Sequence, residues 1–546
     1  MTDMPRVAWV VPPEPIRGLD HLGVQAPCIT LYGQLLPGIT NVTDRVRYYS
    51  FHPWLIWSFD KRYKIKTIEE FRRVLRRAEC LFSLIAIRHA RKLGDTDDSR
   101  HGKALVGRNK LLRVEDTSDF SLDDYATFEG PLRYFKNKLG GLGQYYFGPL
   151  RDLRILDHSP EGAGYPPGYD RRRGCALAEA FDSGVPGDAF FQVVESTSST
   201  WSDLDELSAF CPCGLRDNPT ELELLLDLFL ARSELFQRDG GAVRKASLGL
   251  MLDLVGRKNA RVSGYSFERI LRGAAYSRTL PDGVAWQVVP TFQRAQRGWA
   301  TYQRNELLSL AVQGLFAAVL RAIERDRGGR ILSTADAADV AIKLLPSLTD
   351  KLALSLEDVV AQVRADLPPL TDWMNSEHEI ERGWRLQSFH LSDHLLESVA
   401  AESVAILLAL LARGVDEYPY SDFELDPEYF DPREVHLLSL RQFSRSEWKG
   451  MSVEAWVRWL AVHWGIARHL RVALRKLRGE RRDTFRIRPL ESEFRVVEAP
   501  APTYTVPRVN QSMQILRDLG LVENDEEGAV VLTSRGQQEL EGCRGT

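Results

Sequence analysis

The stretch MQILRDLGLV at residues 513–522, followed by VVLTSRGQQEL at 530–540, decides the fold that we expect at the carboxyl end. It predicts an amphipathic helix that ends in Leu-Arg-Asp-Leu and leads into a short apolar strand. The acidic turn between the two stretches predicts a hairpin. Thr533 or Ser534 is suited to cap a closing helix. The expected order is therefore helix, hairpin, helix.

The same order occurs a second time, much earlier in the chain. FGPLRDLRIL at 147–156 again places Leu-Arg-Asp-Leu before an apolar pair, and RRGCALAEAF at 172–181 again begins a helix after Arg-Gly. The connection between these two stretches is longer and rich in Gly and Pro. We interpret the two regions as copies of one structural unit.

This unit resembles the second half of a winged helix, closely at about 505–541 and more weakly at about 144–181. The resemblance implies a helix that fits a DNA major groove about 12 Å wide. Acidic residues in the C-terminal hairpin would repel phosphate, so a purely protein-binding role stays open. The side chains that the resemblance would place toward DNA are Arg508, Asn510, Gln511, Gln514 and Arg517.

Composition places limits on function. The chain has 546 residues, of which 44% are hydrophobic and 27% charged, enough for several globular domains. The net charge of −4 excludes a whole-protein field that attracts nucleic acid, so such binding requires a local patch. The amino-terminal sequence does not match a signal peptide, and the apolar runs are short. We expect a cytoplasmic protein that does not span a membrane.

Helical patterns dominate the rest of the chain and predict a mainly α, multi-domain protein with winged-helix-like elements near both ends. AFFQVVEST at 189–197 is an exception, because it is compatible with a strand. The expected domains are a helical domain at 1–185 that ends in a winged-helix-like unit, a central helical domain at 186–415, an acidic linker or loop at 416–434, and a basic helix with a winged-helix-like domain at 435–546.

A local basic segment precedes the C-terminal unit. On a helix, residues 468, 471, 475 and 478 share one face, where they would align with phosphates. A solvated face, or pairing with the acidic 416–434 segment, is the alternative. Smaller basic groups occur at 73–77 and 171–173. The candidate phosphate-binding residues are Arg468, Arg471, Arg475, Lys476, Arg478, Arg481 and Arg482.

Three motifs contain residue types that occur in metal, phosphate or redox sites. His390, Asp393 and His394 have the i, i+3, i+4 spacing with which one helix face can hold a metal. The glycines of 140–143 lack a following GK[ST], which favours a flexible turn over a phosphate cradle. Cys211 and Cys213 lack a second pair for a four-ligand zinc set, which favours a tight turn of buried thiols.

Arg304, Asn305 and Glu306 begin a strongly apolar helical stretch, where capping and core hydrogen bonds are favoured over catalysis. The sequence lacks a nucleophile elbow, a Walker motif, HExxH and an EF-hand. It therefore favours a protein that is not an enzyme and needs no cofactor.

The sequence predicts a non-catalytic, nucleic-acid-associated protein whose partners are DNA and other protein subunits. In its general character the chain is similar to accessory subunits of prokaryotic DNA-processing or phage-defence assemblies. A metal-dependent hydrolase or nuclease built on His390, Asp393 and His394 is the first alternative, and a protein–protein adaptor is the second.

Overall fold

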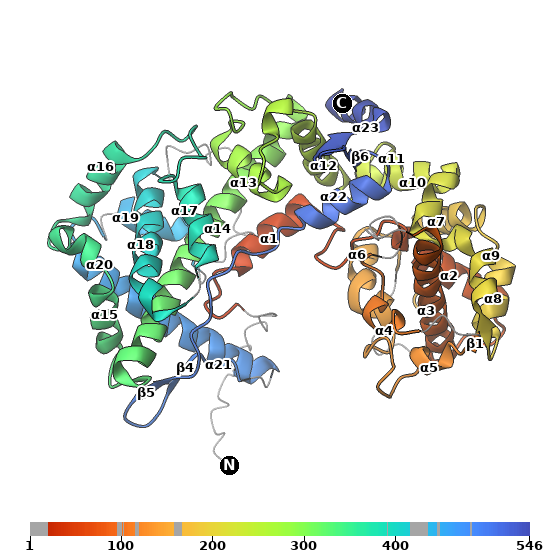
Figure 1. The fold of residues 1–546 in the computed structure, drawn as a ribbon, viewed down its shortest axis with the longest axis horizontal. Coiled ribbons are helices and arrows are strands. Elements are labelled where there is room, and N and C mark those ends of the chain that lie inside the picture. Colours follow the sequence, from red (N-terminus) through yellow and green to blue (C-terminus); the bar gives the residue numbers. More distant parts are fainter. Residues whose placement is uncertain are drawn as a thin grey trace, which may run out of the picture. The chain divides into compact units, whose positions relative to one another are not determined.

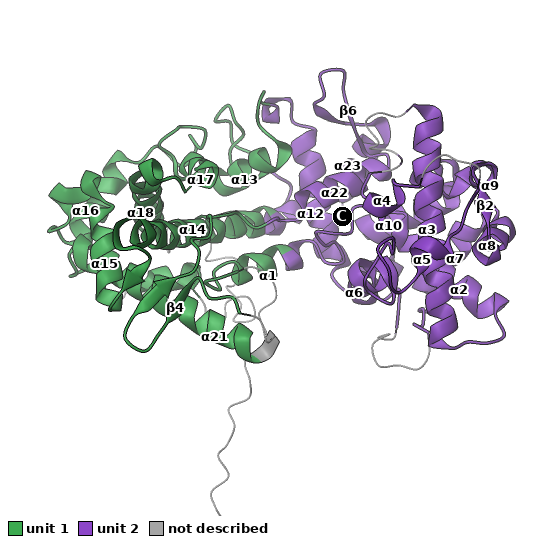
Figure 2. Cartoon of the chain, turned by 60° about the horizontal axis from the view of Figure 1, so that its bottom comes forward, with its two compact units in different colours: residues 1–32, 262–287, 296–505 green, residues 33–261, 288–295, 506–546 purple. Residues whose placement is uncertain are grey.

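The chain is mainly helical and divides into two compact units that interleave along the sequence (Figure 2). The first unit combines residues 1–32, 262–287 and 296–505, and the second combines 33–261, 288–295 and 506–546. The sequence predicts domains that follow one another along the chain, whereas each unit combines segments that are far apart in the sequence. Periodicity along a sequence does not show which distant segments pack together. The computed structural model describes residues 20–94, 101, 103–114, 119–157, 166–389, 391–414, 435–444, 448–480 and 483–545.

The first unit contains most of a long central helix, α14, and a small sheet (Figure 1). Its helices are α1 (Ala26–Leu35), α13 (Phe267–Ser277), α14 (Pro290–Arg327), α15 (Thr334–Lys343), α16 (Leu356–Asp366), α17 (Glu379–Ser388), α18 (Leu396–Ala412), α19 (Arg441–Ser444), α20 (Val453–Trp459) and α21 (Arg468–Glu480). Its strands are β3 (Arg330–Ile331), β4 (Ile487–Pro489) and β5 (Phe494–Val496), in the order β3-β5-β4.

The second unit holds the other helices and two short antiparallel strand pairs, β1 with β2 and β6 with β7. Its helices are α2 (Tyr48–Arg62), α3 (Ile68–Leu93), α4 (Arg108–Leu111), α5 (Asp123–Ala126), α6 (Phe147–Asp152), α7 (Arg173–Asp182), α8 (Gly187–Glu195), α9 (Trp201–Glu206), α10 (Pro219–Leu230), α11 (Glu234–Gln237), α12 (Gly241–Val255), α22 (Val509–Asp518) and α23 (Ser534–Arg544). Its strands are β1 (Asp119–Phe120), β2 (Ser199–Thr200), β6 (Val522–Asn524) and β7 (Val530–Leu532).

Local sequence determines how helix α3 begins. The Thr67 hydroxyl accepts the Glu70 N–H at 3.2 Å and caps the helix, as threonine at this position favours. The strand expected at 189–197 is wrong, because residues 187–195 form α8 and bury Phe190 and Phe191 on one helical face. β-branched and aromatic residues favour strands only weakly, and packing against a core outweighs that preference.

Two apolar helical stretches, Pro290–Arg327 and Asp393–Ala412, meet the length and composition of a membrane span. The protein itself buries 89% of the most apolar window of the first and 67% of the second. This burial is what core helices of a soluble protein show.

The helix–hairpin–helix order expected at the C-terminus is present as α22, β6, β7 and α23. The two strands are antiparallel, with Val522 opposite Leu532. The Thr533 hydroxyl accepts the Gly536 N–H at 2.9 Å and caps α23. The earlier copy runs from α6 through an antiparallel bridge between Leu156 and Tyr169 to α7.

Both copies make the same turn after Leu-Arg-Asp-Leu. The Ile155 N–H donates to the Leu150 carbonyl at 2.8 Å, and the Leu521 N–H donates to the Leu516 carbonyl at 2.9 Å. These bonds satisfy a carbonyl at the end of each helix and direct the chain back across it. The repeated sequence therefore encodes a repeated backbone geometry.

Close packing explains why the Arg-Gly pair of each copy contains a glycine. A Cβ on Gly174 would lie 2.5 Å from the Ile155 carbonyl oxygen, and one on Gly536 would lie 1.9 Å from the Leu521 carbonyl oxygen. In each copy the closing helix thus begins directly against the first strand, where only glycine fits.

The glycine-rich loop at 140–143 closes over a carboxylate from the same unit. The Gly141 and Leu142 N–H groups each donate to Glu79 at 2.8 Å. A Cβ on Gly140, which has a φ of 54°, would lie 2.2 Å from a Glu79 oxygen. The expected flexible turn is therefore an ordered turn whose amides bind a carboxylate of the protein itself.

Candidate nucleic-acid interface

Three arginines lie side by side across the sheet of the first unit. Arg330 on β3 is opposite Arg495 on β5, and Arg495 is opposite Arg488 on β4. Residues that are directly opposite in an antiparallel sheet point to the same face, so the three guanidinium groups share one surface. We call Arg330, Arg488 and Arg495 the arginine ladder. All three side chains are exposed.

The opposite face of this sheet is apolar and buried. Ile331 and Ile487 are 2% and 0% exposed, and Val496 is 9% exposed. These residues alternate with the arginines along the strands, as expected for a sheet with one face on the core. The buried face holds the sheet in place and leaves the ladder facing solvent.

The ladder places like charges against one another. Like charges directly opposite in a sheet are destabilising, and here the arrangement occurs twice in a row. Asp483 pairs with Arg488, and a Glu493 oxygen lies 4.0 Å from Arg330. Among the described residues, no ion pair to Arg495 is present. Within the ladder, two carboxylates therefore pair with three cations, which is an excess of one positive charge.

The basic helix α21 packs beside this sheet in the same unit (Figure 1). The Arg486 N–H, just before β4, donates to His469 Nε2 on α21 at 2.8 Å, and His469 Nδ1 faces the His21 carbonyl at 3.0 Å. Burial lowers the pKa of His469 to about 4, so the imidazole is neutral at pH 7 and can accept this hydrogen bond. The helix and sheet are thus tied together.

Two of the predicted phosphate-binding residues on α21 are internal. Arg468 donates to the Leu22 carbonyl at 2.7 Å, and Lys476 donates to the Asp20 carbonyl at 2.8 Å. They are 5% and 1% exposed. The placement of Arg468 on an exposed stripe, and of Lys476 among the phosphate-binding residues, is therefore wrong, because residues 20–23 cover that side of the helix.

The other predicted residues of this segment differ in position. Arg471 and Arg478 are exposed, and Arg475 is half-buried. Arg481 and Arg482 lie outside the described residues. The exposed arginines of α21 and the arginine ladder lie on elements of the same unit that contact each other, and we group them under the name basic surface: Arg330, Arg471, Arg478, Arg488 and Arg495.

The helix expected to read bases, α22, uses its first polar residues inside the second unit. The Arg508 guanidinium donates to the carbonyls of Leu36 and Ile39, and the Gln511 amide donates to the Asn41 carbonyl at 3.2 Å. Residues 36–41 thus cover this side of α22.

The remaining predicted residues of α22 are more accessible. Gln514 donates to Asp518 at 2.9 Å, and Arg517 donates to Asn524 at 3.1 Å. Asn510 is exposed. These contacts are local to the helix and hairpin.

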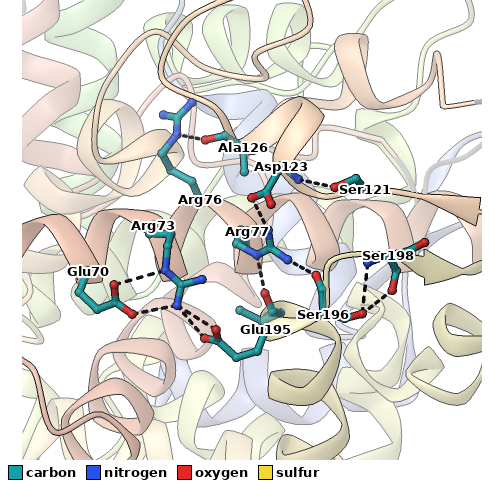
Figure 3. A network of polar contacts seen from close by, with 11 residues as sticks. Glu70, Arg73, Arg76, Arg77, Ser121, Asp123, Ala126, Glu195, Ser196 and Ser198 are labelled. Atoms are coloured by element: carbon teal, nitrogen blue, oxygen red, sulfur yellow. Dashed lines mark hydrogen bonds and ion pairs between the residues drawn. The ribbon is translucent and has the colours of Figure 1, made fainter.

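In the smaller basic group on α3, Arg76 and Arg77 are buried, and Arg73 is a partly exposed residue that forms ion pairs (Figure 3). Arg73 bridges Glu70 and Glu195, each at 2.8 Å. Arg76 is fully buried and donates to four backbone carbonyls, while Arg77 pairs with Asp123. The interpretation of these residues as a basic stripe is wrong, because the guanidinium groups tie neighbouring loops to the helix. Within the 171–173 group, residues 171 and 172 are exposed.

The proposed metal face at 390–394 is not present as a helix face. Asp393 and His394 lie in a single 3₁₀ turn before α18, and His390 lies outside the described residues. The Asp393 carboxylate pairs with Arg321 at 3.2 Å. Residues 391–394 come before α18, so Asp393 and His394 do not lie on one face of an α-helix as the spacing predicts.

Arg304, Asn305 and Glu306 form core hydrogen bonds, as predicted. Arg304 donates to the Leu410 carbonyl at 3.0 Å, and Glu306 accepts the Thr505 N–H at 2.6 Å. Asn305 accepts the N–H of residue 437 at 3.0 Å. The polar start of this apolar stretch therefore connects α14 to surrounding segments.

Sequence reasoning missed one cluster. The predicted tight turn of thiols is present at Cys211 and Cys213, but His89 and His101 lie against it. The Cys211 thiol and the two imidazoles hold the pKa of Cys213 at about 5, while burial raises the pKa of Cys211. More than 100 residues separate the histidines from the thiols, so local spacing gave no signal.

No protein-family model, curated protein or solved structure matches this chain.

Proposed function

We propose that the protein binds the phosphate backbone of nucleic acid through the basic surface of its first unit. The observation that carries the proposal is the arginine ladder, in which three exposed arginines are held in register despite their mutual repulsion. Such an arrangement costs stability unless anions neutralise it, and the protein's own Asp483 and Glu493 pair with only two of the three arginines. A polyanion with regularly spaced charges would do so.

The size of the ladder is comparable to the spacing of phosphates along a nucleic-acid strand. Neighbouring strands of a sheet are about 4.8 Å apart, so the ladder spans about 10 Å at the backbone. Phosphates of one DNA strand rise about 3.4 Å per nucleotide along the axis, and because the strand winds around that axis they lie further apart than this rise, so the long arginine side chains would have to diverge to reach successive phosphates. Arginine forms paired hydrogen bonds with phosphate oxygens, which suits each rung of the ladder.

The proposed contacts are to the phosphate backbone of the nucleic acid and do not distinguish one base sequence from another. We place DNA before RNA on the winged-helix resemblance alone. The repeated units would act as winged-helix-like packing modules within a larger assembly, since residues 36–41 cover part of α22. The protein would thus be a nucleic-acid-associated component, and the proposal includes no catalytic step.

Removal of the ladder is expected to weaken DNA binding by about 100-fold at low salt, since each lost phosphate contact is worth about 1 kcal/mol. The variant is the full chain with Arg330→Ala, Arg488→Ala and Arg495→Ala. Fluorescence anisotropy with a short labelled duplex, a single strand and an RNA duplex measures the dissociation constants.

The matched control removes the same charge elsewhere. Arg171, Arg172 and Arg238 are exposed residues of the second unit, and their triple alanine variant should bind DNA within about threefold of wild type. Thermal midpoints equal to or above that of wild type would show that both variants are folded, and relief of the repulsion within the ladder should raise rather than lower the midpoint of the ladder variant. Equal affinity of the ladder variant and wild type would contradict the proposal and favour the protein–protein adaptor.

A further inference from the structure

Two thiols and two imidazoles converge in the second unit from three separate segments of the chain. His89 lies in the last turns of α3, and His101 lies in a turn beyond it. Cys211 lies between two 3₁₀ turns, and Cys213 lies at the start of the second. One ligand atom from each of the four residues lies within 4.8 Å of the other three. His89 Nδ1 is 3.4 Å from Cys213 Sγ, and His101 Nδ1 is 3.4 Å from Cys211 Sγ.

These distances are close to the edges of a tetrahedral zinc site. With Zn–S near 2.3 Å and Zn–N near 2.05 Å, a tetrahedral angle puts nitrogen and sulfur about 3.6 Å apart. Two sulfur and two nitrogen donors favour zinc over calcium or magnesium, which prefer oxygen. We propose that His89, His101, Cys211 and Cys213 together bind one Zn²⁺ ion.

The surroundings fix the cysteine turn in this geometry. The Arg47 guanidinium donates to the carbonyl of Ala209 at 2.6 Å and to that of Cys211, and pairs with Glu221 at 3.1 Å. Arg47 and Glu221 side chains are both fully buried. Partners of this kind orient metal-binding residues and are often as important as the ligands.

A glycine immediately after the two thiols completes the turn. A Cβ on Gly214 would lie 2.6 Å from the Ala209 carbonyl oxygen and 2.9 Å from Arg47 Nη1. The Cys-Pro-Cys-Gly sequence thus has a backbone that admits no larger residue at its last position. The turn is built to hold both thiols on one side.

The site is structural rather than catalytic. Four protein donors fill a tetrahedral zinc ion and leave no position for substrate. His101 and Cys211 are buried, and His89 and Cys213 are half-buried. The ion would join α3 to the turn at residues 211–213. This inference is independent of nucleic-acid binding.

Elemental analysis of the full chain, purified without chelator, should find one zinc per molecule. The double variant Cys211→Ser/Cys213→Ser should lose this zinc. Cys175→Ser, which changes a free cysteine on α7 outside the cluster, should keep it. Zinc retained in the double variant would overturn the assignment.

Two measurements on wild type keep the test valid where the double variant does not fold. Cobalt substituted for zinc should give the visible absorption of a tetrahedral thiolate site. Alkylation mapped by mass spectrometry should show Cys211 and Cys213 protected with zinc and modified after chelation, with Cys175 reacting equally in both states. The absence of bound zinc together with the absence of a cobalt spectrum, or equal alkylation with and without chelator, would overturn the proposal.

Discussion

Replacement of Glu79 by glutamine is expected to lower the free energy of unfolding by about 3 kcal/mol, with a range of about 2–5. The carboxylate is fully buried and accepts hydrogen bonds from four groups. Two come from the glycine-rich loop, and the others are the Tyr134 hydroxyl at 2.6 Å and His52 Nε2 at 2.9 Å. An amide of the same shape would turn its NH₂ group toward donors and leave them unsatisfied.

Urea unfolding followed by circular dichroism measures this loss. Glu69→Gln is the matched control, because Glu69 is an exposed residue of the same helix whose nearest arginine nitrogen is 3.8 Å away. That control should change the free energy of unfolding by less than about 0.5 kcal/mol. A loss at Glu79 as small as that of the control would show that the loop does not depend on the carboxylate.

Replacement of Arg47 by leucine is expected to cost about 3–5 kcal/mol, the larger part from the buried carboxylate that it leaves behind. Glu221 would keep a hydrogen bond from Ser50 at 2.6 Å but would lose its cation. The carbonyls of residues 209 and 211 would lose their donor as well. Arg62→Leu, at the exposed end of α2, should cost less than about 1 kcal/mol.

A double-mutant cycle separates the ion pair from the carbonyl contacts. Arg47→Leu combined with Glu221→Leu removes both charges, so its cost should be smaller than the sum of the single variants by about 2 kcal/mol or more. All four proteins are unfolded in urea with zinc present in equal concentration. Additive costs would mean that the two side chains are not coupled.

Local sequence patterns predicted the positions of helices well, but they did not predict which residues the polar side chains contact. The Thr67 cap and the repeated Leu-Arg-Asp-Leu turn depend on residues within a few positions of one another, so local sequence is enough to predict them. The helix at 187–195 was missed because its residues favour a strand until their burial is known.

The functional surface was found only in part. Spacing on a helix predicted that Arg471 and Arg478 share a face, and both are exposed. The same rule placed Arg468 with them, but segments distant in sequence cover it. The arginine ladder was invisible because β3 and β5 are more than 150 residues apart, and only the register of the sheet brings their arginines together.

The Cys/His cluster shows the same limitation in the second unit. Cys-Pro-Cys has no second ligand pair nearby in the sequence, and the two histidines that lie against it come from α3 and the turn beyond it. Neither histidine has a sequence neighbour that marks it as a ligand. The two histidines meet the two thiols only because α3 packs against the 3₁₀ turns.

The central claim is that the basic surface binds nucleic acid through phosphate contacts, and the salt dependence of binding tests it most directly. Association constants for a DNA duplex are measured over a series of salt concentrations. Five arginines on phosphates predict a slope of about −4.5 in log K against log salt concentration, and loss of the ladder should reduce its magnitude by about 3. A slope near zero, or the same slope in wild type and the ladder variant, would contradict the account.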